Sequence, residues 1–257
     1  MSAIALRGPA RLVVRQHRLV LWVSGALALA GIALVVGAWL FTSSAAADFA
    51  GTGCSVQHTV SGCGIQVRHF LSVELYYNHL FAYTGLVMTA LPALVGLFVA
   101  GPLVGRELED GTYRLSWSQS VSPARWLAAR LAVPAVLTVS GVAVLSGVYS
   151  WGWSRTHHTH YPLQSSEWWV YSSMGPVPVV YAVLWLVLGA LVALLVRRTL
   201  LAMTITAAAY PLVAGAAYAV RPGGPFWPLQ LAETAVLLGL AAAATVLAFR
   251  VLRRYHV

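Results

Sequence analysis

Six long, uninterrupted apolar runs constrain the fold more than any other feature of the sequence. They cover residues 19–41, 80–104, 126–150, 174–196, 200–220 and 229–249. A helix needs about 20 apolar residues to cross the hydrocarbon core of a bilayer, where every backbone N–H and C=O must be paired within its own segment. The runs are too long, and alternate too little, for strands of a membrane β-barrel. The sequence therefore predicts an all-α integral membrane protein in which residues 1–257 form a single domain of six transmembrane helices.

The composition argues against a soluble fold. Only 9% of the residues are charged, whereas about a quarter are charged in a soluble domain. All sixteen basic residues are arginines, and the formal net charge is +9. Basic residues in so apolar a chain indicate contact with the cytoplasmic face of a lipid bilayer, and we expect no nucleic-acid partner.

The arginines are distributed unevenly along the chain. Thirteen of the sixteen fall on one side of a six-span arrangement: in the N-terminal segment, between residues 105 and 130, at Arg197 and Arg198, and in the C-terminal tail. The other side receives Arg68, Arg155 and Arg221. By the positive-inside rule, we expect both termini and the segment 105–125 in the cytoplasm, and the loop 42–79 outside.

The N-terminal arginines are open to more than one interpretation. Residues 7–20, "RGPARLVVRQHRLV", have the pattern of a basic amphipathic helix lying along the inner leaflet, although they could simply be the positive flank that orients the first span. A cleaved signal peptide is a third interpretation. The 23 uncharged residues of the first run exceed the roughly 7–15 of a signal core, so we expect a retained helix.

The outer loop 42–79 contains both cysteines, Cys54 and Cys63, among glycines. A pair so close in sequence favours a local disulfide in an oxidising exterior. The end of this loop, "VRHFLSVELYYNHL", is amphipathic and could be an interfacial helix or an extension of the second span.

Two ionisable residues fall within predicted spans. Glu233 lies near the outer end of the sixth span and Arg130 near the inner end of the third. Intramembrane charges usually face protein or water, so both are candidates for a pathway or a polar contact. Six of the eight histidines lie in the outer segments. Their spacing matches no closed zinc pattern, and we expect no metal site.

Residues 105–126, "GRELEDGTYRLSWSQSVSPARW", are an island of charge between the second and third spans. Three acids occur here, although acids contribute little to membrane topology, so orientation alone does not explain the segment. Ser122 or Pro123 offers a helix start before the third span. The run 101–131 resembles the permease subunits of type-2 ABC exporters, especially small six-span permeases of actinobacterial type. It shares with them an R-E-x-E-x-G-T stretch, a tryptophan–glutamine element and an R-W pair, but has Ser118 where threonine is common, and Ser122 with Pro123 where a more basic pair is frequent.

The resemblance implies a membrane-spanning permease of the bacterial plasma membrane that pairs with a second copy around a central pathway. It also implies that the loop 105–125 contains a cytoplasmic coupling helix that docks on a separate nucleotide-binding ATPase subunit. The residues that would form this interface are Arg106, Glu107, Glu109, Asp110, Gly111, Thr112, Arg114, Trp117, Gln119 and Arg125.

The sequence contains no lysine, and a standard P-loop requires one to reach the phosphates. We therefore expect this chain to bind no cofactor of its own and to hydrolyse no ATP, with ATP and Mg²⁺ held by the partner subunit. Two other classes of function stay open. One is a membrane-embedded enzyme or metal-binding protein that uses the outer histidines and Glu233; the other is a non-catalytic membrane anchor.

Overall fold

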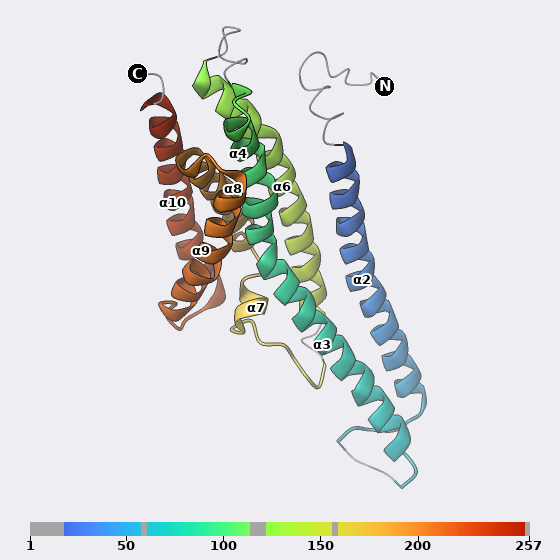
Figure 1. Cartoon of the computed structure of the whole chain (residues 1–257). Coiled ribbons are helices and arrows are strands. Elements are labelled where there is room, and N and C mark those ends of the chain that lie inside the picture. Colours follow the sequence, from blue (N-terminus) through green and yellow to red (C-terminus); the bar gives the residue numbers. More distant parts are fainter. Residues whose placement is uncertain (1–17, 58–60, 114–121, 156–158, 255–257) are drawn as a thin grey trace, which may run out of the picture.

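The computed structural model describes residues 18–57, 61–113, 122–155 and 159–254 (Figure 1). Throughout these ranges the regular structure is helical, and six helices are long and apolar enough to cross a membrane, which confirms the predicted fold class. The elements are α2 (Arg18–Gly51), α3 (Gly64–Leu94), the π-helical segment η1 (Val95–Ala100), α4 (Gly101–Glu109), α6 (Pro123–Ser154), α7 (Trp168–Tyr171), α8 (Val177–Val196), α9 (Thr199–Ala219) and α10 (Phe226–Arg254). Most of the predicted amphipathic helix at residues 7–20 lies outside the described ranges.

The α2–α3 connection is much shorter than the loop predicted at residues 42–79. Helix α2 continues to Gly51 and α3 begins at Gly64, so the prediction was wrong at both ends of this segment. The hydroxyls of Thr42, Ser43 and Ser44 donate to carbonyls three or four residues earlier, so these polar side chains do not end the helix. Three alanines follow, and alanine has the strongest helix propensity. Of the two possibilities for "VRHFLSVELYYNHL", the structure shows the extension of the second span.

A disulfide closes this connection. The sulfur atoms of Cys54 and Cys63 lie 1.98 Å apart. Gly53 and Gly62 adopt positive φ angles of +68° and +106° beside the two cysteines, which lets the chain reverse there. The α2–α3 hairpin projects well beyond α9 and α10, with the disulfide connection at its tip (Figure 1). We call this side of the bundle the disulfide end.

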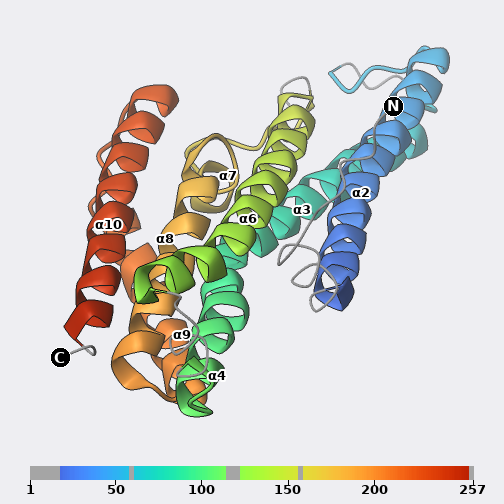
Figure 2. The same ribbon diagram turned by 90° about the horizontal axis from the view of Figure 1, so that it is seen from above.

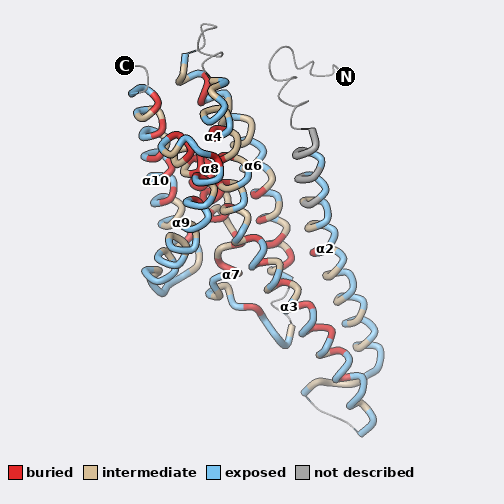
Figure 3. The backbone as a smooth tube through the Cα atoms, in the orientation of Figure 1, coloured by how far each residue is buried: buried red, intermediate tan, exposed pale blue. Residues whose placement is uncertain are grey.

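Helix α8 forms the centre of the bundle and α2 lies at its edge. In α8, 61% of the apolar stretch is buried inside the protein, against 6% in α2. Helices α10, α6, α9, α4 and α3 all contact α8, whereas α2 packs on α3 and α6 (Figure 2). Figure 3 shows buried residues concentrated on α8, and a second series of them along α3 toward the disulfide end. The large apolar side chains exposed on α2 and α9, such as Leu29 and Leu212, suit contact with lipid.

The contact between η1 and α8 is made by two glycine backbones. A Cβ atom on Gly189 would lie 2.5 Å from the Gly96 carbonyl oxygen, and one on Gly96 would lie 2.7 Å from the Trp185 carbonyl oxygen. Small residues allow membrane helices to approach this closely. Pro92, which has no N–H, precedes the π-helical segment. Helix α3 therefore continues through η1 into α4 while η1 packs on α8.

The second end of the bundle gathers most of the arginines. Here lie the end of α4, the start of α6, the turn between α8 and α9, and the last turn of α10 (Figure 1). The arginines of these four segments are Arg106, Arg125, Arg130, Arg197, Arg198, Arg250, Arg253 and Arg254. We call it the arginine-rich end.

Candidate functional site

Helix α4 brings the first half of the charged island against α9. Its buried residues are Gly101, Val104 and Gly105, one to four positions apart on a single face. A Cβ atom on Gly105 would lie 3.1 Å from Thr199 Oγ1 and 3.2 Å from Thr199 Cα, so α4 touches the first residue of α9 directly. The chain reaches Thr199 through Arg197, which has a left-handed backbone at φ 56°, and the extended Arg198. This tight turn presents the beginning of α9 to α4.

Glu109 caps α9. Its carboxylate Oε2 accepts a hydrogen bond of 3.0 Å from the backbone N–H of Thr199. The first N–H groups of a helix have no partner inside the helix, and a carboxylate also interacts favourably with the positive end of the helix dipole. Glu109 thus joins the end of the second span to the start of the fifth.

Glu107 connects α4 to α6. One of its oxygens forms an ion pair with Arg130, and the other accepts a 3.0 Å hydrogen bond from Trp126 Nε1. Trp126 is only 4% exposed, whereas the Arg130 and Glu107 side chains are 30% and 21% exposed. Ser122 caps α6 as its oxygen accepts from the Arg125 N–H, and Pro123 begins the helix as predicted.

The other predicted interface residues of the described part of the island lie near the surface. The side chains of Arg106, Asp110 and Arg125 are exposed, and within the described ranges they form no ion pair. Thr112 is also exposed, and Gly111 has a positive φ of +69° that turns the chain after α4. Arg114, Trp117 and Gln119 lie outside the described residues. The island therefore contains two acids that bind other helices, of which Glu107 is partly buried and Glu109 is exposed, beside further exposed polar residues.

The two predicted intramembrane charges lie in different places. Arg130 belongs to the α4–α6 junction, whereas Glu233 lies toward the disulfide end and pairs with Arg221 at 3.2 Å. Glu233 also accepts a 3.2 Å hydrogen bond from the Tyr181 hydroxyl. The Arg221 guanidinium stacks 3.8 Å above the Tyr171 ring. Burial raises the pKa of the Tyr171 phenol to about 12, so this ring stays neutral beside the ion pair.

The outer histidines do not assemble into a metal site within the described ranges. No group of three His, Cys, Asp or Glu residues there could hold an ion. His160 instead lies 2.9 Å from Glu74 through its Nδ1 atom. His58, His157 and His158 fall outside the described residues.

Sequence reasoning identified both acids of α4, and named Arg130 as a separate candidate, but it did not predict which groups bind these acids. Thr199 had a usable signal, because a polar residue after two arginines and before an apolar run is typical of a helix start. The pairing of Glu107 with Arg130 had none, since it depends on how α4 and α6 pack together. The same is true of Arg221 and Tyr181 around Glu233.

Comparison with known families agrees with this arrangement. Residues 24–221 match the family model described as "ABC-2 membrane transporter related". This match begins inside α2, continues to the end of the fifth span and includes the whole charged island. No curated protein and no solved structure matches the chain. Because the family model covers well over half of the sequence, the chain belongs to the ABC-2 membrane transporter related family and is a multi-pass permease of an ABC transporter.

Proposed function

We propose that this permease forms a translocation pathway as a dimer and is driven by a separate ABC ATPase subunit that docks on the arginine-rich end. In this proposal the protein lies in a bacterial plasma membrane with both termini and the island in the cytoplasm. The partner holds ATP and Mg²⁺, since this chain has no lysine for a P-loop. The family match and the position of the island between two spans support this assignment.

One observation carries the proposal: the acids of α4 connect the island to two further spans. Glu107 binds Arg130 and Trp126 of α6, and Glu109 binds the first N–H of α9. A displacement of the connection between α4 and α6 would therefore move α6 and α9 together with α4. Such a movement can bias a bundle between two discrete packings, one open to each side of the membrane.

We propose two roles for the predicted interface residues. Arg106, Asp110, Thr112 and Arg125 are exposed and can contact a partner. Glu109 is exposed as well, but it and Glu107 already bind groups on other helices, so we propose that these two acids transmit the movement rather than form the docking surface. Mutation of the two sets should then produce different defects.

The test uses the permease co-expressed with its ATPase. Charge reversals Arg106→Glu, Asp110→Arg and Arg125→Glu should reduce co-purification of the ATPase. Glu107→Gln and Glu109→Gln should leave co-purification intact but lower transport per ATP hydrolysed. The matched control is Asp48→Arg, a reversal at an exposed position near the disulfide end.

Two outcomes would contradict the proposal. If the surface reversals leave co-purification and ATP turnover unchanged, the arginine-rich end is not the docking surface. If the purified permease alone hydrolyses ATP, the catalytic subunit has been assigned wrongly.

A further inference from the structure

The last turns of α10 carry positive charge that no described carboxylate neutralises. Arg250, Arg253 and Arg254 follow the apolar part of the helix, and none of them forms an ion pair within the described ranges. Two of the acids at this end, Glu107 and Glu109, are already engaged by α6 and α9. The α10 arginines are therefore available to an anionic ligand.

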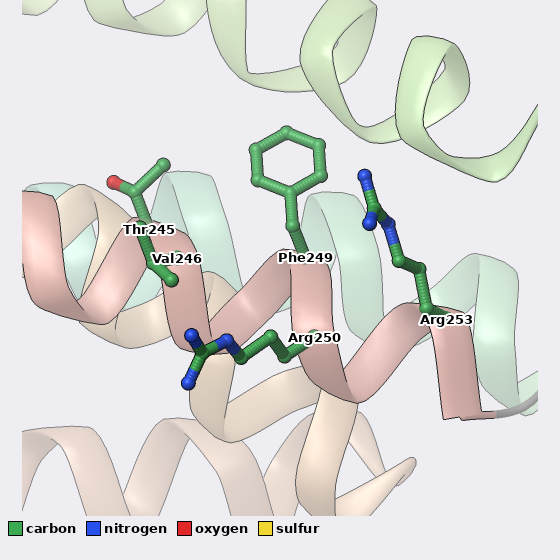
Figure 4. Close-up of a pocket in the computed structure, with 5 residues that line it drawn as sticks. All are labelled: Thr245, Val246, Phe249, Arg250 and Arg253. Carbon is green, nitrogen blue, oxygen red and sulfur yellow. The ribbon is translucent and has the colours of Figure 1, made fainter.

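Two of these arginines line a groove on α10. The groove has a volume of about 330 Å³ and is lined by Thr245, Val246, Phe249, Arg250 and Arg253. Figure 4 shows Phe249 and Arg253 pointing to the same side of the helix, whereas the Arg250 side chain extends along the helix in a different direction. The Thr245 hydroxyl donates to the Ala241 carbonyl, so the polar side chains of the groove that are left to bind a ligand are the two arginines, beside the apolar Val246 and Phe249.

The length of the apolar part of α10 indicates that the groove falls at the depth expected for lipid phosphates. An apolar helix of about 20 residues spans the hydrocarbon core, and the apolar part of α10 ends at Phe249. Arg250 and Arg253 then fall at the polar boundary, and Val246, which is 49% exposed, faces the hydrocarbon. Helix α10 lies at one edge of the bundle, so lipid can reach this surface (Figure 2).

We propose that this groove binds an anionic glycerophospholipid from the leaflet at the arginine-rich end. The arginines would bind the phosphodiester through charge-assisted hydrogen bonds, and an acyl chain would lie along Val246 and Phe249. A zwitterionic lipid lacks the net negative charge that two unpaired arginines favour. The groove contains none of the residues that we propose to contact the ATPase, although it lies at the same end of the bundle.

The test measures lipid binding to the full-length permease. The permease would be mixed in detergent with phosphatidylglycerol or phosphatidylcholine. Native mass spectrometry would then measure how much of each lipid the permease retains after the detergent is removed. The wild-type chain should retain phosphatidylglycerol preferentially. Arg250→Gln and Arg253→Gln should each weaken this retention roughly fivefold, as expected for one arginine near an anionic surface. Arg254→Gln removes the same charge from the same helix outside the groove and should have a much smaller effect.

Three results would overturn the proposal. One is equal retention of the two lipids by the wild-type chain, a measurement that does not depend on the folding of any variant. Another is an equal loss in Arg254→Gln, which would indicate diffuse attraction rather than a site. The third is displacement of the lipid by inorganic phosphate, which would identify a free phosphate as the ligand.

Discussion

Replacement of Glu107 by alanine tests the junction between α4 and α6. The substitution removes an ion pair with Arg130 and a 3.0 Å hydrogen bond from Trp126. The pair is partly buried, at 30% and 21% exposure, so its contribution lies between that of surface pairs and that of buried pairs, at about 1–2 kcal/mol. The hydrogen bond adds about 1 kcal/mol. We therefore expect the free energy of unfolding to fall by about 2–3 kcal/mol.

The assay is reversible unfolding in mixed micelles, titrated with sodium dodecyl sulfate and followed by helical circular dichroism. Glu107→Gln retains an oxygen acceptor for Trp126, so it should lower the free energy of unfolding by less than Glu107→Ala does. A double-mutant cycle with Arg130→Ala should give a coupling energy of about 1–2 kcal/mol. Asp48→Ala, at an exposed position near the disulfide end, is the control and should unfold as the wild type does. If the effects of Glu107→Ala and Arg130→Ala were simply additive, the structural reasoning about this junction would be refuted.

Three further predictions concern other parts of the bundle. Gly189→Ala should destabilise the protein by about 1–3 kcal/mol in the same unfolding assay, because its Cβ would lie 2.5 Å from a backbone oxygen of η1. The control Gly215→Ala adds a Cβ in open space and should not destabilise the protein. Glu233→Gln should lower the free energy of unfolding by about 3 kcal/mol, since it leaves the largely buried Arg221 without its counter-charge. A variant that also replaces Arg221 should recover part of this loss. After reduction, Cys54 and Cys63 should react with a membrane-impermeant thiol reagent in intact cells; labelling only after lysis would reverse the proposed orientation.

The six spans could be predicted because each depends on a local property, a long run of apolar residues. Their ends were harder to place, because the hydroxyls of Thr42, Ser43 and Ser44 bond back to their own helix and extend α2 past the apolar run. Polar composition there looked like a loop, yet local hydrogen bonds satisfy these side chains within the helix. Helix boundaries thus depend on side-chain hydrogen bonding that hydropathy does not record.

The candidate site was predictable in position but not in its internal contacts. The charge pattern and the family resemblance both placed it between the second and third spans. Glu109, however, binds an N–H that lies 90 residues later in the sequence, and Glu107 binds a side chain on a different helix. Such contacts arise from the packing of α4 against α6 and α9. The sequence therefore located both acids but could not show that each of them binds a different helix.

The glycine contact between η1 and α8 divides one long continuous helix into arms of unequal length. From Gly96 the helix runs about 20 Å to Glu109 and about 50 Å to Gly64, at 1.5 Å per residue. A rigid tilt about this contact would multiply a displacement at Glu109 about two-and-a-half-fold at the far end. A push of one ångström at the arginine-rich end would then swing the disulfide-closed tip by more than two. The projecting α2–α3 hairpin is thus the part of the permease in which a small movement at the island would produce the largest excursion.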